Sequence, residues 1–254
     1  MERISWSTQK NATLTLLREA KTAIAARAAL LKDDPTIAAA HKIIEHGCKH
    51  VMIDPTVTSA NYGQGPPYRT LDWQAFAAVG NINAALWPGQ SAVVWQDNDW
   101  NWLHPLDSPL GMETGANVHV DMMQNEWATA SFVITSTSDR SQPLSISADV
   151  FQGPTAVTSG PVLKISHVVH SEAFGFNYRD DVIVPIDEEP VVLRPGVAKR
   201  IWLTFKTRDK NIVPGTYTST IKVLSGKATI ARVPVALRVW PFRFPDNVSL
   251  HSNT

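Results

Sequence analysis

The chain has 254 residues, of which 44% are hydrophobic, so it can bury a sizeable core in one large or two small domains. Its 23 basic and 23 acidic residues cancel, which gives no electrostatic reason to expect nucleic acid or an acidic membrane as a partner. No run of residues has the length and apolar character of a membrane helix, and residues 1–30 lack the pattern of a signal peptide. A single cysteine excludes an internal disulfide framework.

The first third of the sequence has helical periodicity. Apolar residues recur at helical spacing over 12–32: Leu16, Leu17, Ala20, Ile24 and Leu31. Asp34 and Pro35 then form a typical N-cap and first position of a second helix, which is expected to end near 46–47. Thr70 is expected to cap a third helix, although Gly80 inside it costs about 1 kcal/mol relative to Ala.

From residue 88 onward the pattern changes to short alternating segments bounded by Ser, Asp, Gly and Pro. They lie at 91–95, 118–122, 129–135, 144–151, 162–169, 182–186, 191–193, 200–206, 217–223 and 228–240. This spacing predicts a mainly β fold, an antiparallel two-sheet β-sandwich of the Ig-like kind preceded by a small α-helical segment. We therefore divide the chain into a helical N-terminal extension at 1–88 and a β-sandwich domain at 89–254.

The last three predicted strands follow one another through short connections. Ile201, Leu203 and Phe205 alternate with polar or mixed residues, and Pro214 with Gly215 is a turn signal before the next strand. This arrangement predicts that the three strands form one antiparallel sheet.

Three tryptophans lie within eight positions beside acidic side chains: Trp95, Asp97, Asp99, Trp100 and Trp102. Sugar rings stack on aromatic faces while their hydroxyls bond to carboxylates and amides, so this segment is a candidate carbohydrate-binding site. The alternative is that the tryptophans pack the helical segment against the strands.

Metal and cofactor signals are weak in this sequence. Asp97, Asp99 and Asn101 have the spacing of a calcium loop, but Trp102 stands where Gly is required and Ser108 where Glu is required. Structural calcium by another geometry stays open as an alternative. We predict no cofactor and no metal site.

Several motifs in the C-terminal half occur in a characteristic order. They are Gln-Asn-Glu-Trp at 124–127, Ser-Phe-Val-Ile-Thr at 131–135, Arg-Asp-Asp-Val-Ile-Val-Pro at 179–185, Leu-Arg-Pro-Gly at 193–196, Arg-Ile-Trp-Leu at 200–203, Pro-Gly-Thr-Tyr at 214–217 and Val-Trp-Pro-Phe-Arg-Phe-Pro at 239–245. Over about 118–250 the chain resembles the N-terminal β-sandwich of bacterial glycoside-hydrolase-like proteins that carry a downstream barrel of unknown function.

The resemblance implies an accessory module whose intramolecular partner is the catalytic barrel that follows it. The sugar-cleaving carboxylates of such proteins lie in that barrel, so no catalytic residue is carried over to this chain. The chain stops at Thr254, where the barrel would begin, so we expect a fragment of a bacterial parent protein that is secreted or held in the cell envelope.

Three functions remain in competition at this point. The first is a non-catalytic accessory module that packs on a barrel and contacts polysaccharide. The second is a structural or adhesion module of the Ig type that binds protein through a sheet edge or an apolar patch. The third is a self-contained glycosidase that uses carboxylates such as Asp180 or Asp181.

Overall fold

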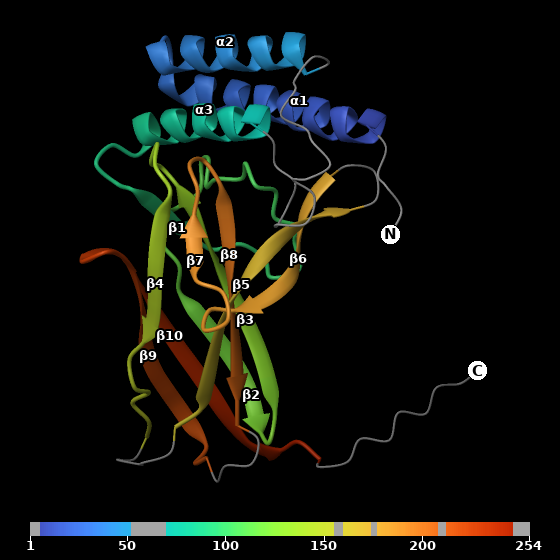
Figure 1. The fold of residues 1–254 in the computed structure, drawn as a ribbon. Helices are drawn as coiled ribbons and strands as arrows, with labels where there is room; N and C mark the ends of the chain where they lie inside the picture. The colour runs from blue at the N-terminus through green and yellow to red at the C-terminus, as the bar shows by residue number, and fades with distance from the viewer. Residues whose placement is uncertain (1–5, 52–69, 155–159, 174–176, 208–211, 246–254) are drawn as a thin grey trace.

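The structure is a computed structural model that describes residues 6–51, 70–154, 160–173, 177–207 and 212–245. Within these residues the chain is mainly β, with three helices and two five-stranded sheets (Figure 1). The helices are α1 (Trp6–Leu31), α2 (Pro35–His50) and α3 (Thr70–Leu86). The strands are β1 (Ala92–Trp95), β2 (Val118–Gln124), β3 (Trp127–Ser136), β4 (Gln142–Ala148), β5 (Val162–Ala173), β6 (Asn177–Pro185), β7 (Val191–Leu193), β8 (Ala198–Lys206), β9 (Gly215–Ser225) and β10 (Ala228–Arg243).

All three predicted helices are confirmed. Helix α1 begins six residues before the predicted start, because no Gly or Pro interrupts the polar stretch that precedes the first periodic apolar residue. The predicted cap of α2 is also confirmed: Asp34 Oδ1 accepts a hydrogen bond from the Thr36 N–H at 2.8 Å. The buried side of α1 is the predicted one, with Leu16, Leu17 and Ile24 at most 1% exposed.

The glycine inside α3 is explained by a close backbone contact. A Cβ atom on Gly80 would lie 2.7 Å from the backbone nitrogen of Gly196, and one on Gly196 would lie 2.0 Å from the Phe76 oxygen. Gly196 also has a φ of +65°, which favours glycine. Helix α3 therefore rests directly on the turn between β7 and β8, which brings the helices over one end of the strands (Figure 1).

The two sheets share one hydrophobic core. Sheet A has the strand order β1-β3-β8-β5-β6, and sheet B has the order β2-β10-β9-β4-β7. Phe132, Ile201 and Phe205 of sheet A belong to the same buried cluster as Tyr217 and Leu237 of sheet B. All five are at most 1% exposed, so the facing sides of the two sheets are dry.

The prediction that the last three strands form one antiparallel sheet is wrong. Strands β9 and β10 do pair antiparallel, but β8 lies in sheet A, and β10 pairs on its other side with β2 in parallel. Alternation along β8 correctly shows that one side is apolar. It cannot show which sheet the strand joins, because both sheets bury their apolar sides in the same core.

The helices are joined to the strands through a second core and a buried arginine. Leu106 and Val197 belong to the cluster formed by the helical side chains. Arg27 of α1 is 1% exposed and donates from Nη2 to the Leu106 oxygen at 2.8 Å and to Ser108 Oγ at 2.7 Å. Among the described residues, no helix is long and apolar enough to cross a membrane.

Candidate functional site

The predicted tryptophan segment is part of a loop, residues 96–110, that crosses the side of sheet A facing away from sheet B. We call this side the outer face of sheet A. Ile201 points into the shared core, so its neighbours Arg200 and Trp202 lie on the outer face, together with their cross-strand partners Val133 and Ser131. The loop covers the half of this face nearer the helices, which we call the upper half. There the Pro105 oxygen accepts from the Ala198 N–H at 2.8 Å, and the Asp107 oxygen accepts from the Thr135 hydroxyl at 3.0 Å.

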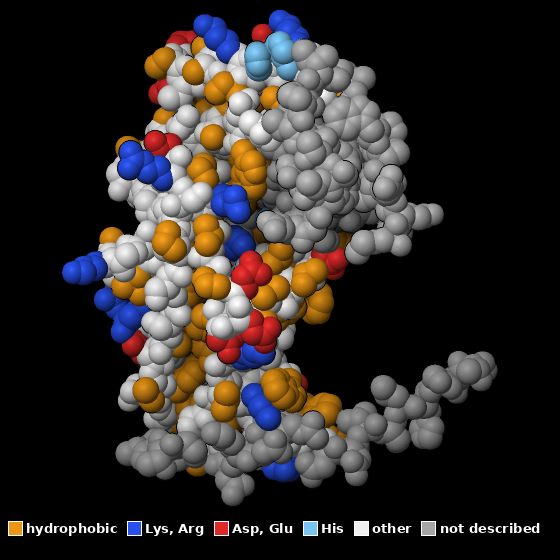
Figure 2. Space-filling view, viewed as in Figure 1, with side chains coloured by type: hydrophobic (Ala, Val, Ile, Leu, Met, Phe, Trp, Pro, Cys, Tyr) orange, Lys and Arg blue, Asp and Glu red, His pale blue; other side chains and the backbone are white. Residues whose placement is uncertain are grey.

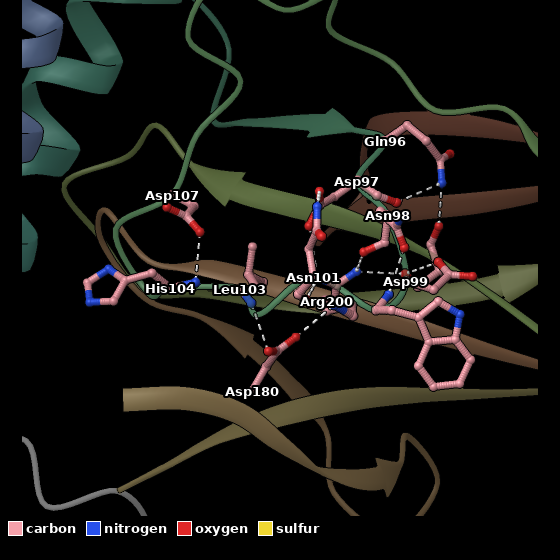
Figure 3. Close-up of polar contacts among 12 residues, drawn as sticks. Gln96, Asp97, Asn98, Asp99, Asn101, Leu103, His104, Asp107, Asp180 and Arg200 are labelled. Carbon is pink, nitrogen blue, oxygen red and sulfur yellow. Dashed lines mark hydrogen bonds and ion pairs between the residues drawn. The ribbon is translucent and has the colours of Figure 1, made fainter. Parts of the chain in front are cut away.

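Arg200 fastens the loop to the sheet, and Figure 3 shows its side chain at the centre of the polar contacts. Its side chain is only 1% exposed. All five N–H groups are used: Nε donates to Asp180 Oδ2 at 2.7 Å, Nη1 to the Asn98 oxygen at 3.2 Å and Ser131 Oγ at 3.0 Å, and Nη2 to Asp97 Oδ2 at 3.0 Å and the Asn101 oxygen at 2.8 Å. One buried cation thus joins the loop, β3 and β6 to β8.

The predicted acidic residues Asp97 and Asp99 serve this anchoring. Asp97 receives Arg200 through one oxygen and the Asn101 amide through the other at 3.0 Å, while Asp99 Oδ1 accepts from the Ser131 hydroxyl at 2.6 Å. Their negative charge is balanced by a guanidinium and by hydrogen-bond donors of the protein. Among the described residues there is no group of three or more His, Cys, Asp or Glu side chains arranged to hold a metal ion.

Asp180, considered above as a catalytic carboxylate, also belongs to the anchor. Its Oδ2 accepts from Arg200, and its Oδ1 accepts from the Leu103 backbone N–H at 2.8 Å. Its side chain is 7% exposed, and neither oxygen is left open toward solvent for a substrate. Asp180 therefore acts as a support of the loop, while the neighbouring Asp181 is exposed on β6.

The three predicted tryptophans separate into two kinds. Trp100 is 83% exposed and Trp102 is 62% exposed, so both present indole surface to solvent. Trp95 is 5% exposed, and its indole N–H donates to Thr135 Oγ1 at 3.0 Å. The expectation that Trp95 offers a ring to a ligand is therefore corrected: it is the last residue of β1 and packs beneath the loop, where it contacts Leu103.

A local turn sets the position of Trp100. The side chain of Asn98 accepts from the Trp100 N–H at 3.0 Å, and its backbone oxygen accepts from the Asn101 N–H at 3.0 Å. This Asx turn forms without help from distant residues, because Asn bonds readily to the backbone two residues later. Arg200 then holds the turn against the sheet, so Trp100 projects from a backbone fixed at several points.

A buried histidine lies under the same loop. His170 is 5% exposed, and burial, reinforced by the positive charge of Lys199, lowers its pKa to about 3. Its imidazole is therefore neutral at ordinary pH. His170 therefore adds no second positive charge beside Arg200.

A cleft of about 370 Å³ opens between α1 and the second half of the loop. Glu19 Oε2 and His104 Nε2 lie 3.0 Å apart at its side, and burial raises the pKa of Asp107. Burial also lowers the pKa of Arg27 to about 10. These polar groups already join α1 to the loop, so the cleft is a weaker candidate site than the exposed tryptophans.

Sequence reasoning did not identify Arg200 and Ser131 as the support of the loop. One signal was present: Asp97 and Asp99 are close together in a chain of net charge zero, and a partly buried carboxylate needs a cationic or hydrogen-bonding partner. The sequence could not say which of the 23 basic residues supplies it, since Arg200 is about one hundred residues away.

No family model and no curated protein sequence matches the chain. Among solved structures, a family 123 glycoside hydrolase from Clostridium perfringens is similar with a TM-score of 0.41 and 13% identity, over 50% of this chain and 24% of that one. The SrpA adhesin from Streptococcus sanguinis gives a TM-score of 0.27 and 14% identity, over 49% of this chain and 56% of that one. The CfaE adhesin of enterotoxigenic E. coli gives a TM-score of 0.27 and 10% identity, over 66% of this chain and 50% of that one. These likenesses are weak and assign no function.

Proposed function

We propose that this chain is a non-catalytic accessory module of a larger glycoside-hydrolase-like protein, and that the first half of the loop, residues 96–103, contacts a polysaccharide. The observation that carries the proposal is the pair of exposed indoles, Trp100 and Trp102, on a loop anchored by the buried Arg200. Two large aromatic side chains exposed within three positions of one loop give an apolar surface of the kind that marks binding sites.

The anchoring favours ligand binding for a physical reason. A loop that is ordered before binding loses little conformational entropy when a ligand arrives, so more of the stacking energy appears as affinity. Asn98 and Asn101 are exposed in the same loop, and each amide makes one hydrogen bond within the loop. A primary amide can make further hydrogen bonds, which suits sugar hydroxyls. Aromatic faces with neighbouring amides are the combination that a carbohydrate needs.

The sandwich and the barrel are part of the same proposal. Two sheets that share one core support an Ig-like β-sandwich, and so does Tyr217, which is 1% exposed and donates from its hydroxyl to the Val213 oxygen at 2.8 Å. A tyrosine that bonds back to the backbone before its own strand is typical of such sandwiches. The characteristic order of the sequence motifs over 118–250 supports packing on a downstream barrel, where the catalytic carboxylates would lie.

Affinity gel electrophoresis tests the sugar contact. The purified chain is run through gels that contain hydroxyethylcellulose, xylan, galactomannan or laminarin. We expect at least one polysaccharide to retard the chain, and the Trp100→Ala, Trp102→Ala double variant to lose that retardation with an unchanged unfolding midpoint. Trp240→Ala is the matched control, because that indole lies on β10 in sheet B and bonds to Asp121.

Two results would reject the polysaccharide contact. One is normal migration of the wild-type chain in every gel. The other is unfolding of the double variant, because it would mean that Trp100 and Trp102 pack the structure rather than bind a ligand.

An adhesion module that binds protein is the second candidate, and the edge of sheet A favours it. Strand β6 is an edge strand, and its residues Val182 and Ile183 are 49% and 48% exposed. An apolar edge strand can pair with an extended segment of another protein. If no glycan binds, we expect the chain to self-associate through β6 in sedimentation experiments, and Ile183→Lys to abolish that self-association. Self-association that persists in Ile183→Lys would reject this candidate.

A further inference from the structure

We infer that the glycan contact continues from the loop along the open lower half of the outer face of sheet A, where it takes an extended polysaccharide chain. This inference rests on the proposed function and deepens it. The surface is the aromatic strip, which we define as Trp100, Trp202 and Trp127. Its rings come from three segments that are far apart in the sequence.

The strand register places two of these rings on one surface. Trp202 of β8 is directly opposite Ser131 of β3, and Trp127 of β3 is directly opposite Lys206 of β8. Residues two apart on a strand share a face, so Trp202 and Lys206 both lie on the outer face with Arg200. Trp127 lies there too, because directly opposed residues share a face.

The third ring reaches the same surface through the loop. Asp99 bonds to the Ser131 hydroxyl at 2.6 Å, and Ser131 is the cross-strand partner of Trp202. Trp100 follows Asp99 directly in the chain. The loop therefore reaches down the face as far as the row that contains Trp202, and the open half of the face begins below that row.

The open half is exposed along its whole length. Trp127 is 52% exposed and Val162 of β5 is 42% exposed, while Trp202 is partly exposed. The row between the two indoles consists of Thr129, Thr204 and Lys164, which pair across β3, β8 and β5. Each of these three side chains is at least partly exposed, so none of them is covered by the described part of the chain.

The length of the strip indicates the length of the ligand. Trp202 and the row of Trp127 are four residues apart along β8, which corresponds to about 13 Å at the rise of an extended strand. That distance exceeds a disaccharide unit. One sugar ring cannot reach both indoles, whereas an extended chain of several sugars can stack on both and pass over Trp100 as well.

The chemistry of the strip favours a glycan over a protein surface. Its aromatic rings are separated by hydroxyl and amine groups, so they do not form the continuous apolar core that a protein interface has. On the side of the molecule shown in Figure 2, hydrophobic side chains lie among basic and acidic ones. The charged groups on the rows of the strip are the ammonium groups of Lys164 and Lys206. The Lys206 ammonium lies 4.8 Å from the centre of the Trp127 ring, which holds that indole in place. Rigid rings with hydroxyls and amines between them suit a chain of sugars, whose ring faces stack and whose hydroxyls bond to these polar groups.

Titration calorimetry with oligosaccharides tests this inference. The probes are cello-, xylo- and manno-oligosaccharides from disaccharide to hexasaccharide. We expect the hexasaccharide of the recognised series to bind about tenfold more tightly than the disaccharide, because it gains a second stacking contact. Trp127→Ala should remove that gain, while the disaccharide, held at Trp100 and Trp102, keeps its affinity.

Further variants keep the test decisive. Trp127→Phe retains an aromatic ring and should retain most of the gain. Thr129→Arg places a long side chain across the middle row at an exposed position and should weaken only the hexasaccharide, even if Trp127→Ala disturbs the start of β3. Phe242→Ala removes a 63% exposed aromatic side chain from sheet B and should change nothing.

The possible failures are distinguishable. If affinity does not grow with chain length and Trp127→Ala binds all lengths normally, the strip is not a glycan surface, although the loop proposal survives as long as the loop variants lose binding. If no glycan binds at all, the proposed function fails and the strip fails with it. If Trp127→Ala abolishes self-association and leaves glycan affinities unchanged, the strip is a protein contact and the inference is wrong.

Discussion

Two arginines whose side chains are almost completely buried, Arg27 and Arg200, join segments that are distant in the sequence. Both use the fixed geometry of the guanidinium to satisfy several acceptors at once, which a lysine ammonium cannot imitate. Arg200 has two carboxylate partners, so its neighbours would carry uncompensated negative charge without it. Arg27 instead bonds mainly to neutral oxygens of Asn83, Leu106 and Ser108.

Replacing Arg200 should be among the most damaging single changes in this chain. Arg200→Met leaves Asp180 and Asp97 without their cation, and breaking a buried ion pair costs about 3–5 kcal/mol. Urea unfolding followed by tryptophan fluorescence measures the loss. Arg232→Met, at an exposed position on β10, is the control and should stay close to wild type. Near-equal stability of the two variants would contradict the conclusion that Arg200 anchors loop 96–110.

The buried His170 should make stability depend on pH. Its pKa of about 3 in the folded chain lies below its ordinary value of 6.5, so between these values the unfolded chain binds a proton that the folded chain does not. The free energy of unfolding therefore falls as the pH drops through this window, by about 2 kcal/mol between pH 6.5 and pH 5. Above pH 6.5 the imidazole is neutral in both the folded and the unfolded chain, so the stability lost at low pH is fully present there.

Unfolding by urea at about pH 7 and about pH 5 checks this slope. His170→Gln should lose the part of the slope that this imidazole contributes, whatever its effect at neutral pH. Val168→Ala, a buried change on the same strand, should lower stability equally at both pH values. A slope identical in wild type and His170→Gln would mean that the folded chain protonates this imidazole normally.

At the level of single residues, the sequence pattern drew attention to the tryptophan segment but did not predict how its side chains are arranged. Trp100 and Trp102, two of the tryptophans proposed to contact a sugar, are exposed. Trp95 is only one residue before the loop, but strand β1 ends there and its side chain packs under the loop. Trp202 and Trp127 were not connected with the site, because their common surface depends on the pairing of β3 with β8.

The elements themselves were largely predictable, since helical and strand periods are local. Ten strand segments were predicted near the ten strands observed in the described residues, and the three helices lie where they were expected. The assignment of strands to sheets was not predictable in the same way. Whether β8 joins sheet A or sheet B depends on long-range pairing. Strand β2 likewise lies at the edge of sheet B, where it pairs in parallel with β10, which is far away in the sequence.

The contact between α3 and the turn before β8 gives a prediction at this scale. Gly196→Ala should cost about 2–4 kcal/mol, because the residue keeps a φ of +65° and its new Cβ would overlap the Phe76 oxygen. Gly226→Ala has a similar φ of +58° with no atom within 4 Å, so it should cost about 1 kcal/mol. Thermal unfolding measured by circular dichroism compares the two variants. Equal losses would show that the close approach of α3 to this turn is not tight.

At the scale of the whole molecule, the sequence pattern divides the chain into a helical extension at 1–88 and a strand-rich part at 89–254. The contacts across that division are substantial. Helical side chains share a core cluster with Leu106 and Val197. Arg27 of α1 donates to the Leu106 oxygen at 2.8 Å, and Asn83 of α3 donates to the Ser136 oxygen at 3.2 Å. These contacts are buried, so each half would expose apolar and polar groups if the other unfolded.

We therefore expect helices and sheets to unfold together. Far-ultraviolet circular dichroism follows the helices, and tryptophan fluorescence follows mainly the strand region; in urea the two transitions of the wild-type chain should coincide. Arg27→Met should move both midpoints together, at a cost of about 3 kcal/mol, because it leaves the buried oxygens of Asn83 and Leu106 without a donor. Arg18→Met, at an exposed position of the same helix, controls for the change in helix composition and should move neither. Two separate transitions in the wild-type chain, with Arg27→Met moving only the helical one, would instead establish 1–88 and 89–254 as independent domains.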